Sequence, residues 1–232
     1  MQASDSTNFV LVHGGAHAAW CWDRLVPHLR ADARVGSVVA VDLSGHGARR
    51  DVKPLEAITL ADYVDDVVRE IESRDLREVV LVGHSLAGIT IPHAAARVAA
   101  RMRRLVYLST SNPRPGESLM DLMKHPLSPL SRRLEARTMF CNDLDAETTT
   151  WLLSKIGPEP RGPMVETLPA VAPHAAVAST YILLERDEAL PPAFQREQAR
   201  NAGVDEIVSF DAGHSAFASR PRDLAALLLR YA

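Results

Sequence analysis

Short apolar runs alternate with amphipathic segments along most of the chain. Six of these runs are rich in aliphatic residues and are bounded by glycine or polar residues, which is typical of buried parallel strands. They predict strands near residues 9–13, 37–41, 79–83, 104–109, 179–184 and 206–210. Helices are expected at 20–29, 60–71, 86–102, 193–202 and 221–231. This alternation predicts an α/β fold in which helices cover both faces of a mostly parallel sheet of about six strands.

The segment 60–71 has the clearest helical pattern, because its apolar residues recur at the spacing of one helix face. Thr59 and Asp62 stand three residues apart at its start, which matches a capping box. We therefore expect a helix to begin directly after Thr59.

Composition narrows the classes of protein to which the chain can belong. With 232 residues it is long enough for one well-packed domain. Its 26 basic and 29 acidic residues give a net charge of −3, which argues against nucleic acid as a partner. Two cysteines are too few for a disulfide framework. The first eight residues are polar, and no apolar run approaches the ~20 residues that cross a bilayer, so we expect a cytoplasmic protein without membrane contact.

The predicted strand 79–83 ends in a sequence that favours a sharp turn around a serine. Gly83, Ala87 and Gly88 surround Ser85 and leave room for the chain to reverse into a helix. This pattern is typical of a nucleophile elbow, in which a strained turn exposes a serine hydroxyl. The usual motif is G-x-S-x-G, and a methyl group at Ala87 is a modest departure from it. An ordinary strand-to-helix turn that happens to contain a serine is the alternative.

A carboxylate follows the predicted strand 179–184. Asp187 falls on the loop at its carboxyl end, where parallel sheets place their chemistry. Glu185, Glu188 and Asp211 are rival acids, and Asp187 could instead cap the following helix. We favour Asp187 because Glu185 should face one side of the sheet and Asp211 is too close to the histidine described next.

A histidine completes the set of reactive groups. His214 lies 27 positions after Asp187, which leaves room for one crossover helix and one strand. The order Ser85, Asp187, His214 is the order in which a hydrolase of the elbow type carries its triad. In such a triad the histidine takes the serine proton, and the aspartate fixes and stabilises the imidazole.

A glycine-rich loop follows the predicted strand 9–13. Gly14 and Gly15 leave backbone N–H groups free to point into a cavity, and such a loop commonly supplies half of an oxyanion hole. The two donors would be the amides of Gly15 and Leu86. A phosphate-binding loop is the competing interpretation, but the Lys-Ser/Thr ending of a P-loop is missing.

Two histidines in the same region raise the possibility of a metal site. His13 and His17 are four residues apart, but they lie on a strand end and a loop and not on one helix face, and no third ligand stands out. We therefore expect no metal.

Taken together, four segments carry a family resemblance. These segments are 9–22 (FVLVHGGAHAAWCW), 83–88 (GHSLAG), 190–195 (LPPAFQ) and 211–215 (DAGHS). Along nearly its whole length the chain resembles the α/β-hydrolase superfamily, and within it the small methylesterase and hydroxynitrile lyase group with its bacterial relatives. The resemblance implies an α/β-hydrolase fold, the triad Ser85–Asp187–His214 and no cofactor.

The same resemblance separates two activities. Plant hydroxynitrile lyases of this group carry a threonine after the strand-end histidine and a lysine after the catalytic histidine. This chain has Gly14 and Ser215 at those positions, so no lysine charge is present there to receive a leaving cyanide. Hydrolysis of a small-molecule ester is therefore favoured.

Between residues 110 and 177 no strand pattern interrupts short helical segments and prolines. An insertion at this place in the fold predicts a helical cap over the active site within a single domain of residues 1–232. Its helices are expected at 117–124 and 145–156. Leu119, Phe140 and Trp151, together with Gly14, are the candidates for lining a substrate pocket. Packing of these apolar residues between cap and core is the alternative.

The sequence thus predicts a serine carboxylesterase, with methyl esters among its candidate substrates. Lyase, thioesterase or C–C bond hydrolase chemistry on the same scaffold, or a non-catalytic small-molecule receptor, are the alternatives. The oligomeric state is not predicted.

Overall fold

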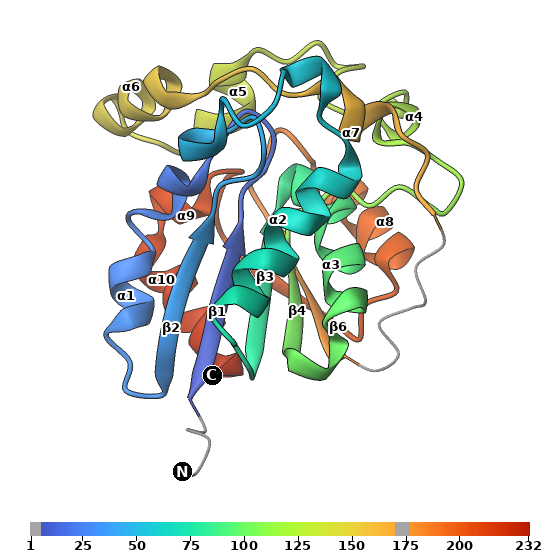
Figure 1. The fold of residues 1–232 in the computed structure, drawn as a ribbon. Coiled ribbons are helices and arrows are strands. Elements are labelled where there is room, and N and C mark those ends of the chain that lie inside the picture. The colour runs from blue at the N-terminus through green and yellow to red at the C-terminus, as the bar shows by residue number, and fades with distance from the viewer. Residues whose placement is uncertain (1–5, 170–176) are drawn as a thin grey trace.

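Six parallel strands form a sheet at the centre of the computed structural model, which describes residues 6–169 and 177–232 (Figure 1). Their spatial order is β2-β1-β3-β4-β5-β6. The strands are β1 (Thr7–Val12), β2 (Val35–Val41), β3 (Val79–His84), β4 (Met102–Leu108), β5 (Ser179–Leu184) and β6 (Glu206–Phe210). All six predicted strands are confirmed within two residues at either end, and so is the α/β-hydrolase fold class.

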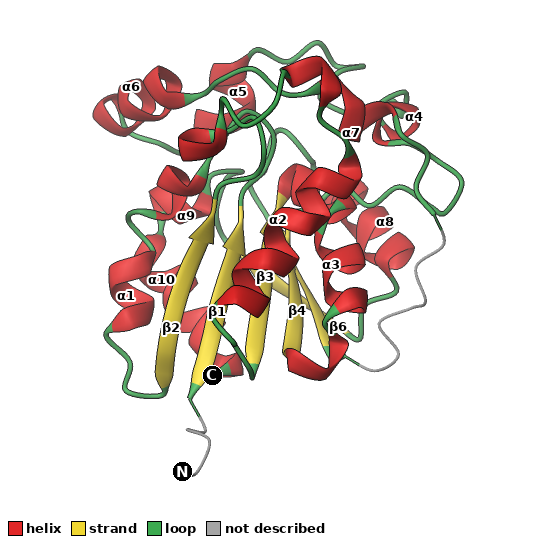
Figure 2. Ribbon diagram, in the orientation of Figure 1, coloured by secondary structure: helices red, strands yellow, loops and turns green. Residues whose placement is uncertain are grey.

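Helices cover both faces of the sheet (Figure 2). One face packs against α2 (Leu60–Ser73), α3 (Ile91–Arg97) and α8 (Pro192–Ala202). The other packs against α1 (Val26–Arg30), α9 (Ala216–Ser219) and α10 (Pro221–Leu228). Within β1, Val10 and Val12 join the first core while Phe9 and Leu11 join the second. Both faces of the strand are buried, which explains why its sequence is a continuous apolar run.

Local sequence explains where the helices begin and break. The capping box of Thr59 and Asp62 is present at the start of α2, as predicted. The helices expected at 20–29 and 86–102 are each broken into shorter pieces. Pro27 and Pro92 stand in the first turn of α1 and α3, where the missing N–H is harmless, whereas a continuous helix through either residue would lose a hydrogen bond. The 3₁₀ helices are η1 (Ala19–Trp22), η2 (Gly47–Arg49), η3 (Leu55–Ala57), η4 (Ser85–Ile89), η5 (Ala99–Arg101) and η6 (Leu229–Tyr231).

Residues 109–169, here called the β4–β5 connection, lie beyond the carboxyl ends of the strands (Figure 1). Its helices are α4 (Leu119–Leu122), α5 (Ala136–Cys141), α6 (Ala146–Lys155) and α7 (Arg161–Val165). The predicted helix at 145–156 is confirmed as α6, and the one at 117–124 is shorter than predicted. The sequence pattern predicted neither α5 nor α7. Residues 170–176 of the predicted cap lie outside the described part of the chain.

The β4–β5 connection packs on both sides of the core. Leu119 and Leu122 of α4 join the core beneath α2 and α3, whereas Cys141 and Leu152 of α5 and α6 join the core beneath α9 and α10. The connection therefore bridges the two helical layers at the end of the sheet where the loops carry the candidate chemistry. Among the described residues, no helix has the length and apolar character needed to span a membrane.

Candidate active site

The turn after β3 holds Ser85 in a strained conformation. Its φ angle is +53°, in the left-handed region that residues other than glycine seldom adopt. Neighbouring glycines make the turn possible, since a Cβ on Gly83 would lie 2.7 Å from the side chain of Ile91 and one on Gly88 only 2.2 Å from the carbonyl oxygen of Ser111. Ala87 is fully buried, so its methyl group fits in the turn at the position where the motif usually has glycine. The strand-to-helix geometry is that of a nucleophile elbow.

Ser85, His214 and Asp187 form a continuous chain of hydrogen bonds. Nδ1–H of His214 donates to Oδ2 of Asp187 over 2.7 Å, which leaves Nε2 as the acceptor that faces the Ser85 hydroxyl at 3.0 Å. Asp187 and His214 are 3% and 1% exposed, whereas Ser85 is partly exposed. The three residues predicted from separate strand ends are thus brought together, with the serine oxygen at the accessible end.

The carboxylate of Asp187 has two further donors. Leu190 N–H donates to Oδ1 over 2.9 Å, and the hydroxyl of Ser109 donates to Oδ2 over 2.6 Å. The rival acids Glu185, Glu188 and Asp211 are all exposed. Ser109 is not among the residues predicted from the sequence, although it directly follows β4, and functional side chains gather at such strand ends.

The backbone of His214 is held by the residue that precedes the serine. Nε2–H of His84 donates to the carbonyl oxygen of His214 over 2.9 Å. His84 is fully buried, and burial holds its pKa well below the usual value. A neutral imidazole therefore links the elbow directly to the loop that carries the candidate base.

The glycine loop lies against the elbow. A Cβ on Gly14 would approach Cβ of Ser85 to 2.7 Å, and one on Gly15 would lie 3.2 Å from Cδ1 of Leu86. Leu86 stands in the first turn of η4, where backbone N–H groups lack an acceptor within the helix. The loop that carries the Gly15 amide and the turn that carries the Leu86 amide therefore adjoin Ser85, and their role as an oxyanion hole stays a prediction.

Two neutral histidine side chains, His13 and His17, hydrogen-bond to the carbonyl groups of the glycine loop. Leu43 N–H donates to Nε2 of His13, so Nδ1–H of this ring donates to the Gly14 carbonyl over 2.8 Å. His17 donates through Nδ1 to the Gly15 carbonyl over 2.7 Å. Burial lowers the pKa of His13 well below its usual value and that of His17 to about 4. Among the described residues, no group of three or more potential ligands could hold a metal ion.

The predicted pocket residues are spread over different parts of the molecule. Gly14 touches the elbow, and Phe140 lies beside the candidate base, with its ring centre 5.9 Å from that of His214. Trp151 instead packs edge-on against Trp20 at 5.4 Å. Leu119 is buried in the core on the other side of the sheet. Their contact with a substrate stays a prediction.

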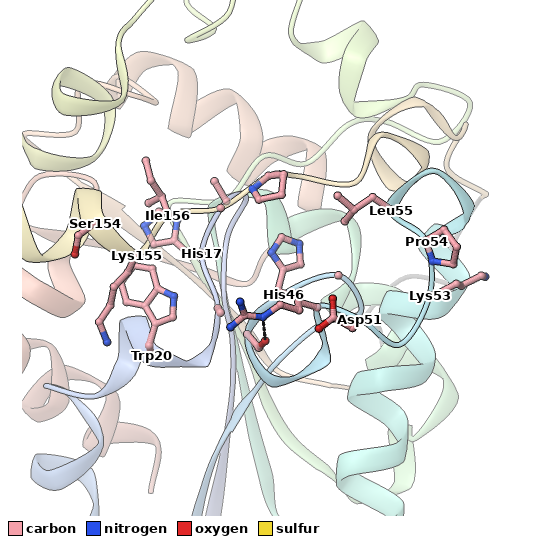
Figure 3. Close-up of a pocket in the computed structure, with 17 residues that line it drawn as sticks. His17, Trp20, His46, Asp51, Lys53, Pro54, Leu55, Ser154, Lys155 and Ile156 are labelled. Atoms are coloured by element: carbon pink, nitrogen blue, oxygen red, sulfur yellow. Dashed lines mark hydrogen bonds between the residues drawn. The ribbon is translucent and has the colours of Figure 1, made fainter.

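A cavity of about 800 Å³ opens beside the glycine loop (Figure 3). It is bounded by Ala16, His17 and Trp20 on one side and by segments 45–55 and 154–158 on the others. Neither the three residues of the hydrogen-bonded chain nor the four predicted pocket residues line this cavity. It therefore lies next to the loop but away from the serine hydroxyl.

Comparison with known proteins places this geometry in a family. Residues 9–227 match the model of the alpha/beta hydrolase family. Salicylic acid-binding protein 2 of Nicotiana tabacum is 28% identical over 263 residues, which cover 98% of each chain. A carbendazim-hydrolyzing esterase of Nocardioides is 39% identical over 122 residues, but these cover only 53% of this chain and 49% of the esterase.

A solved structure agrees along the whole length. An extracellular α/β-hydrolase from a Paenibacillus species, described as structurally and functionally homologous to the tobacco protein, superposes with a TM-score of 0.82 at 25% identity. The superposition covers 97% of this chain and 98% of the other. Several Arabidopsis thaliana methylesterases are also among the relatives, which confirms the predicted resemblance. By sequence match and by fold, the chain belongs to the α/β-hydrolase family.

Proposed function

We propose that this protein is a carboxylesterase that uses Ser85 as its nucleophile. The observation that supports this most strongly is the hydrogen-bonded chain from Ser85 through His214 to Asp187, which ends in a partly exposed hydroxyl. A serine hydroxyl is a weak nucleophile at neutral pH and gains reactivity from a base within hydrogen-bond reach. The names of the relatives, esterases and methylesterases, favour the same chemistry.

The proposed reaction has two halves. In the first, Oγ of Ser85 attacks the ester carbonyl carbon and its proton moves to Nε2 of His214. The carbonyl oxygen becomes an oxyanion, which the N–H groups of Gly15 and Leu86 would stabilise. The intermediate then breaks its bond to the alcohol oxygen, which leaves with the proton from His214. An acyl group remains on Ser85.

In the second half, water attacks the acyl-enzyme. His214 accepts a proton from the water, the second tetrahedral intermediate breaks its bond to Oγ, and the proton returns to Ser85. The carboxylic acid is released. Throughout, Asp187 holds the imidazole in the tautomer that accepts through Nε2 and stabilises its positive form.

Two residues favour ester hydrolysis over cyanohydrin cleavage. Gly14 has no space for a threonine side chain, since even a Cβ would lie 2.7 Å from Cβ of Ser85. Ser215 is fully buried and brings no positive charge beside the base. Small or medium esters, with methyl esters of aromatic or polyketide-like acids among them, are the proposed substrates.

The test is hydrolysis of a graded series of p-nitrophenyl esters and of methyl benzoate by wild type and Ser85→Ala. We expect turnover by wild type and its loss in the variant, which removes only one oxygen atom and should fold normally. Equal hydrolysis by both proteins would contradict the proposal. Cleavage of a cyanohydrin or a thioester in preference to every ester would replace it with another reaction on the same triad, and ligand binding without any turnover would favour a receptor.

A further inference from the structure

The β4–β5 connection forms two hydrogen bonds with Ala16, the residue that follows Gly15. Ala16 N–H donates to Oε2 of Glu159 over 2.7 Å, and Gly157 N–H donates to the Ala16 carbonyl over 2.9 Å. Ala16 itself has a φ of +62°, which is strained for a residue with a Cβ. Both backbone polar groups of Ala16 are therefore held by the segment 157–159.

The Glu159 carboxylate is itself held in place. Its Oε1 accepts from the hydroxyl of Tyr63 over 2.8 Å, and Nε2 of His46 lies 2.9 Å from that hydroxyl and 3.5 Å from Oε2. The side chain of Glu159 is 14% exposed. Burial, reinforced by the negative charge of Glu159, raises the pKa of Tyr63, so its hydroxyl stays a donor. Glu159 is thus a fixed acceptor.

The contact bears directly on the direction of the Gly15 amide. Ala16 N–H and the Gly15 carbonyl belong to one rigid peptide plane. Glu159 holds the N–H end of this plane, and Nδ1–H of His17 holds the carbonyl end over 2.7 Å. Glycine rotates about φ and ψ at little cost, so two consecutive glycines would let the loop turn if one end of the plane were free. The Gly15 N–H belongs to the preceding peptide plane, whose Gly14 carbonyl accepts from His13, and the two planes meet at the Gly15 Cα. Holding the Gly15–Ala16 plane therefore limits the rotations of Gly15 that could turn its N–H away.

We propose that Glu159 is a positioning residue for oxyanion stabilisation, acting through Ala16 on the amide of Gly15. This proposal rests on the proposed function, because it assigns the Gly15 amide a role in ester hydrolysis. Its effect is geometric: Glu159 need not touch the substrate. The negative charge of Glu159 lies close to the loop, with Oε2 3.4 Å from a Cβ built on Gly15, and would by itself disfavour a developing oxyanion. A neutral acceptor at this position should therefore serve equally well.

Three variants separate position from charge. Glu159→Ala removes the acceptor, Glu159→Asp withdraws it by one methylene, and Glu159→Gln retains an acceptor oxygen without the charge. Glu166→Ala is the matched control, because Glu166 also belongs to the β4–β5 connection and accepts from Leu60 N–H over 3.1 Å, away from the loop. Each protein is assayed for kcat and KM with p-nitrophenyl acetate and for its melting temperature.

We expect Glu159→Ala and Glu159→Asp to lower kcat about tenfold with less than about a twofold change in KM, a fraction of the loss that follows removal of a whole oxyanion donor. Glu159→Gln should stay within about threefold of wild type. Glu166→Ala should keep wild-type kcat. Inhibition by a trifluoromethyl ketone, whose adduct with serine carries the same oxyanion, should weaken in parallel with kcat in the Ala and Asp variants.

Two results would overturn the positioning role. One is wild-type kcat in both Glu159→Ala and Glu159→Asp, and the other is an equal loss of kcat in Glu166→Ala. Because the Asp variant keeps a charged, hydrogen-bonding side chain, it remains informative if the Ala variant does not fold. Failure of the underlying function has a different signature, since hydrolysis would then survive in Ser85→Ala.

Discussion

Two regions of the molecule meet at one edge of the sheet. The loops that follow β3, β5 and β6 carry Ser85, Asp187 and His214, and the β4–β5 connection carries Asp143 and Glu159. The first three contribute side chains that can exchange a proton or stabilise one. The other two accept hydrogen bonds from the backbone of the loops beneath them, Asp143 from Gly213 N–H over 2.7 Å and Glu159 from Ala16 N–H over 2.7 Å.

The strand-end loops and the β4–β5 connection therefore have different roles at the same site. The fully buried strands β3 and β5 fix where the loops of Ser85 and Asp187 start, and the partly exposed edge strand β6 does so for His214, but the loops that follow have backbone freedom of their own. Asn142 adds a third contact of this kind, since its Nδ2 donates to the carbonyl of Arg186, the neighbour of Asp187. The sheet thus brings the candidate catalytic side chains together, and the β4–β5 connection holds the backbone of the neighbouring loops.

The largest effect should come from the strand ends. Asp187→Asn and His214→Ala are each expected to lower kcat for p-nitrophenyl acetate by about 10³-fold or more, because the triad acts as a unit. Asp211→Asn is the control, since this exposed carboxylate pairs with Arg186 at the surface. A decrease in kcat no larger in Asp187→Asn than in Asp211→Asn would contradict a special role for the strand-end residues.

The next largest effect concerns the free energy of unfolding at low pH, which depends on His17. His17 is neutral in the folded protein with a pKa of about 4, against 6.5 in the unfolded chain, so the unfolded state binds more protons between these values. The stability that depends on the neutral ring is complete above pH 6.5 and decreases as the pH falls towards 4, by about 3 kcal/mol for this residue.

Urea unfolding at pH 7 and pH 4.5 measures this loss. His17→Gln should lose less free energy of unfolding between the two values than wild type, because it cannot titrate. His28→Gln, at an exposed position of α1, should lose as much as wild type. Identical losses in all three proteins would show that His17 does not control acid stability.

A smaller effect is expected at Ser109, which lies at a strand end yet contributes only a hydrogen bond. Removing its hydroxyl takes one of the donors from Asp187 and should lower kcat about tenfold, close to the ~1.4 kcal/mol typical of one such bond. Ser109 has a φ of +43°, so Ser109→Gly removes the hydroxyl and relieves the backbone, whereas Ser109→Ala keeps the strain. Equal kcat values in both variants, well below wild type, would assign the effect to the hydroxyl.

This division also explains what the sequence could predict. The inner strands β1, β3 and β5 were predictable because they are buried and therefore continuous apolar runs, and the order Ser85, Asp187, His214 was predictable because such residues follow directly at strand ends. The helices predicted at 20–29 and 86–102 were too long because Pro27 and Pro92 lie within them. A proline in the first turn starts a new helix and does not extend the preceding one.

The β4–β5 connection was less predictable for physical reasons. Helices of five or six residues such as α5 and α7 are too short for a periodic pattern, and tertiary packing stabilises them. Glu159 stands between Pro158 and Pro160, which indicates a loop and says nothing of its partner. That partner, Ala16, is 143 residues away in the sequence. Contacts between a side chain and a distant backbone group leave no local signal.

Labelling by a fluorophosphonate, read by intact-protein mass and peptide mapping, tests whether Ser85 is an activated nucleophile. We expect a single adduct on Ser85 of the wild type, no adduct in Ser85→Ala, and much slower labelling in Asp187→Asn. A folded wild-type protein that gains no mass, or a Ser85→Ala variant labelled as fully as wild type, would contradict the claim that Ser85 is an activated nucleophile.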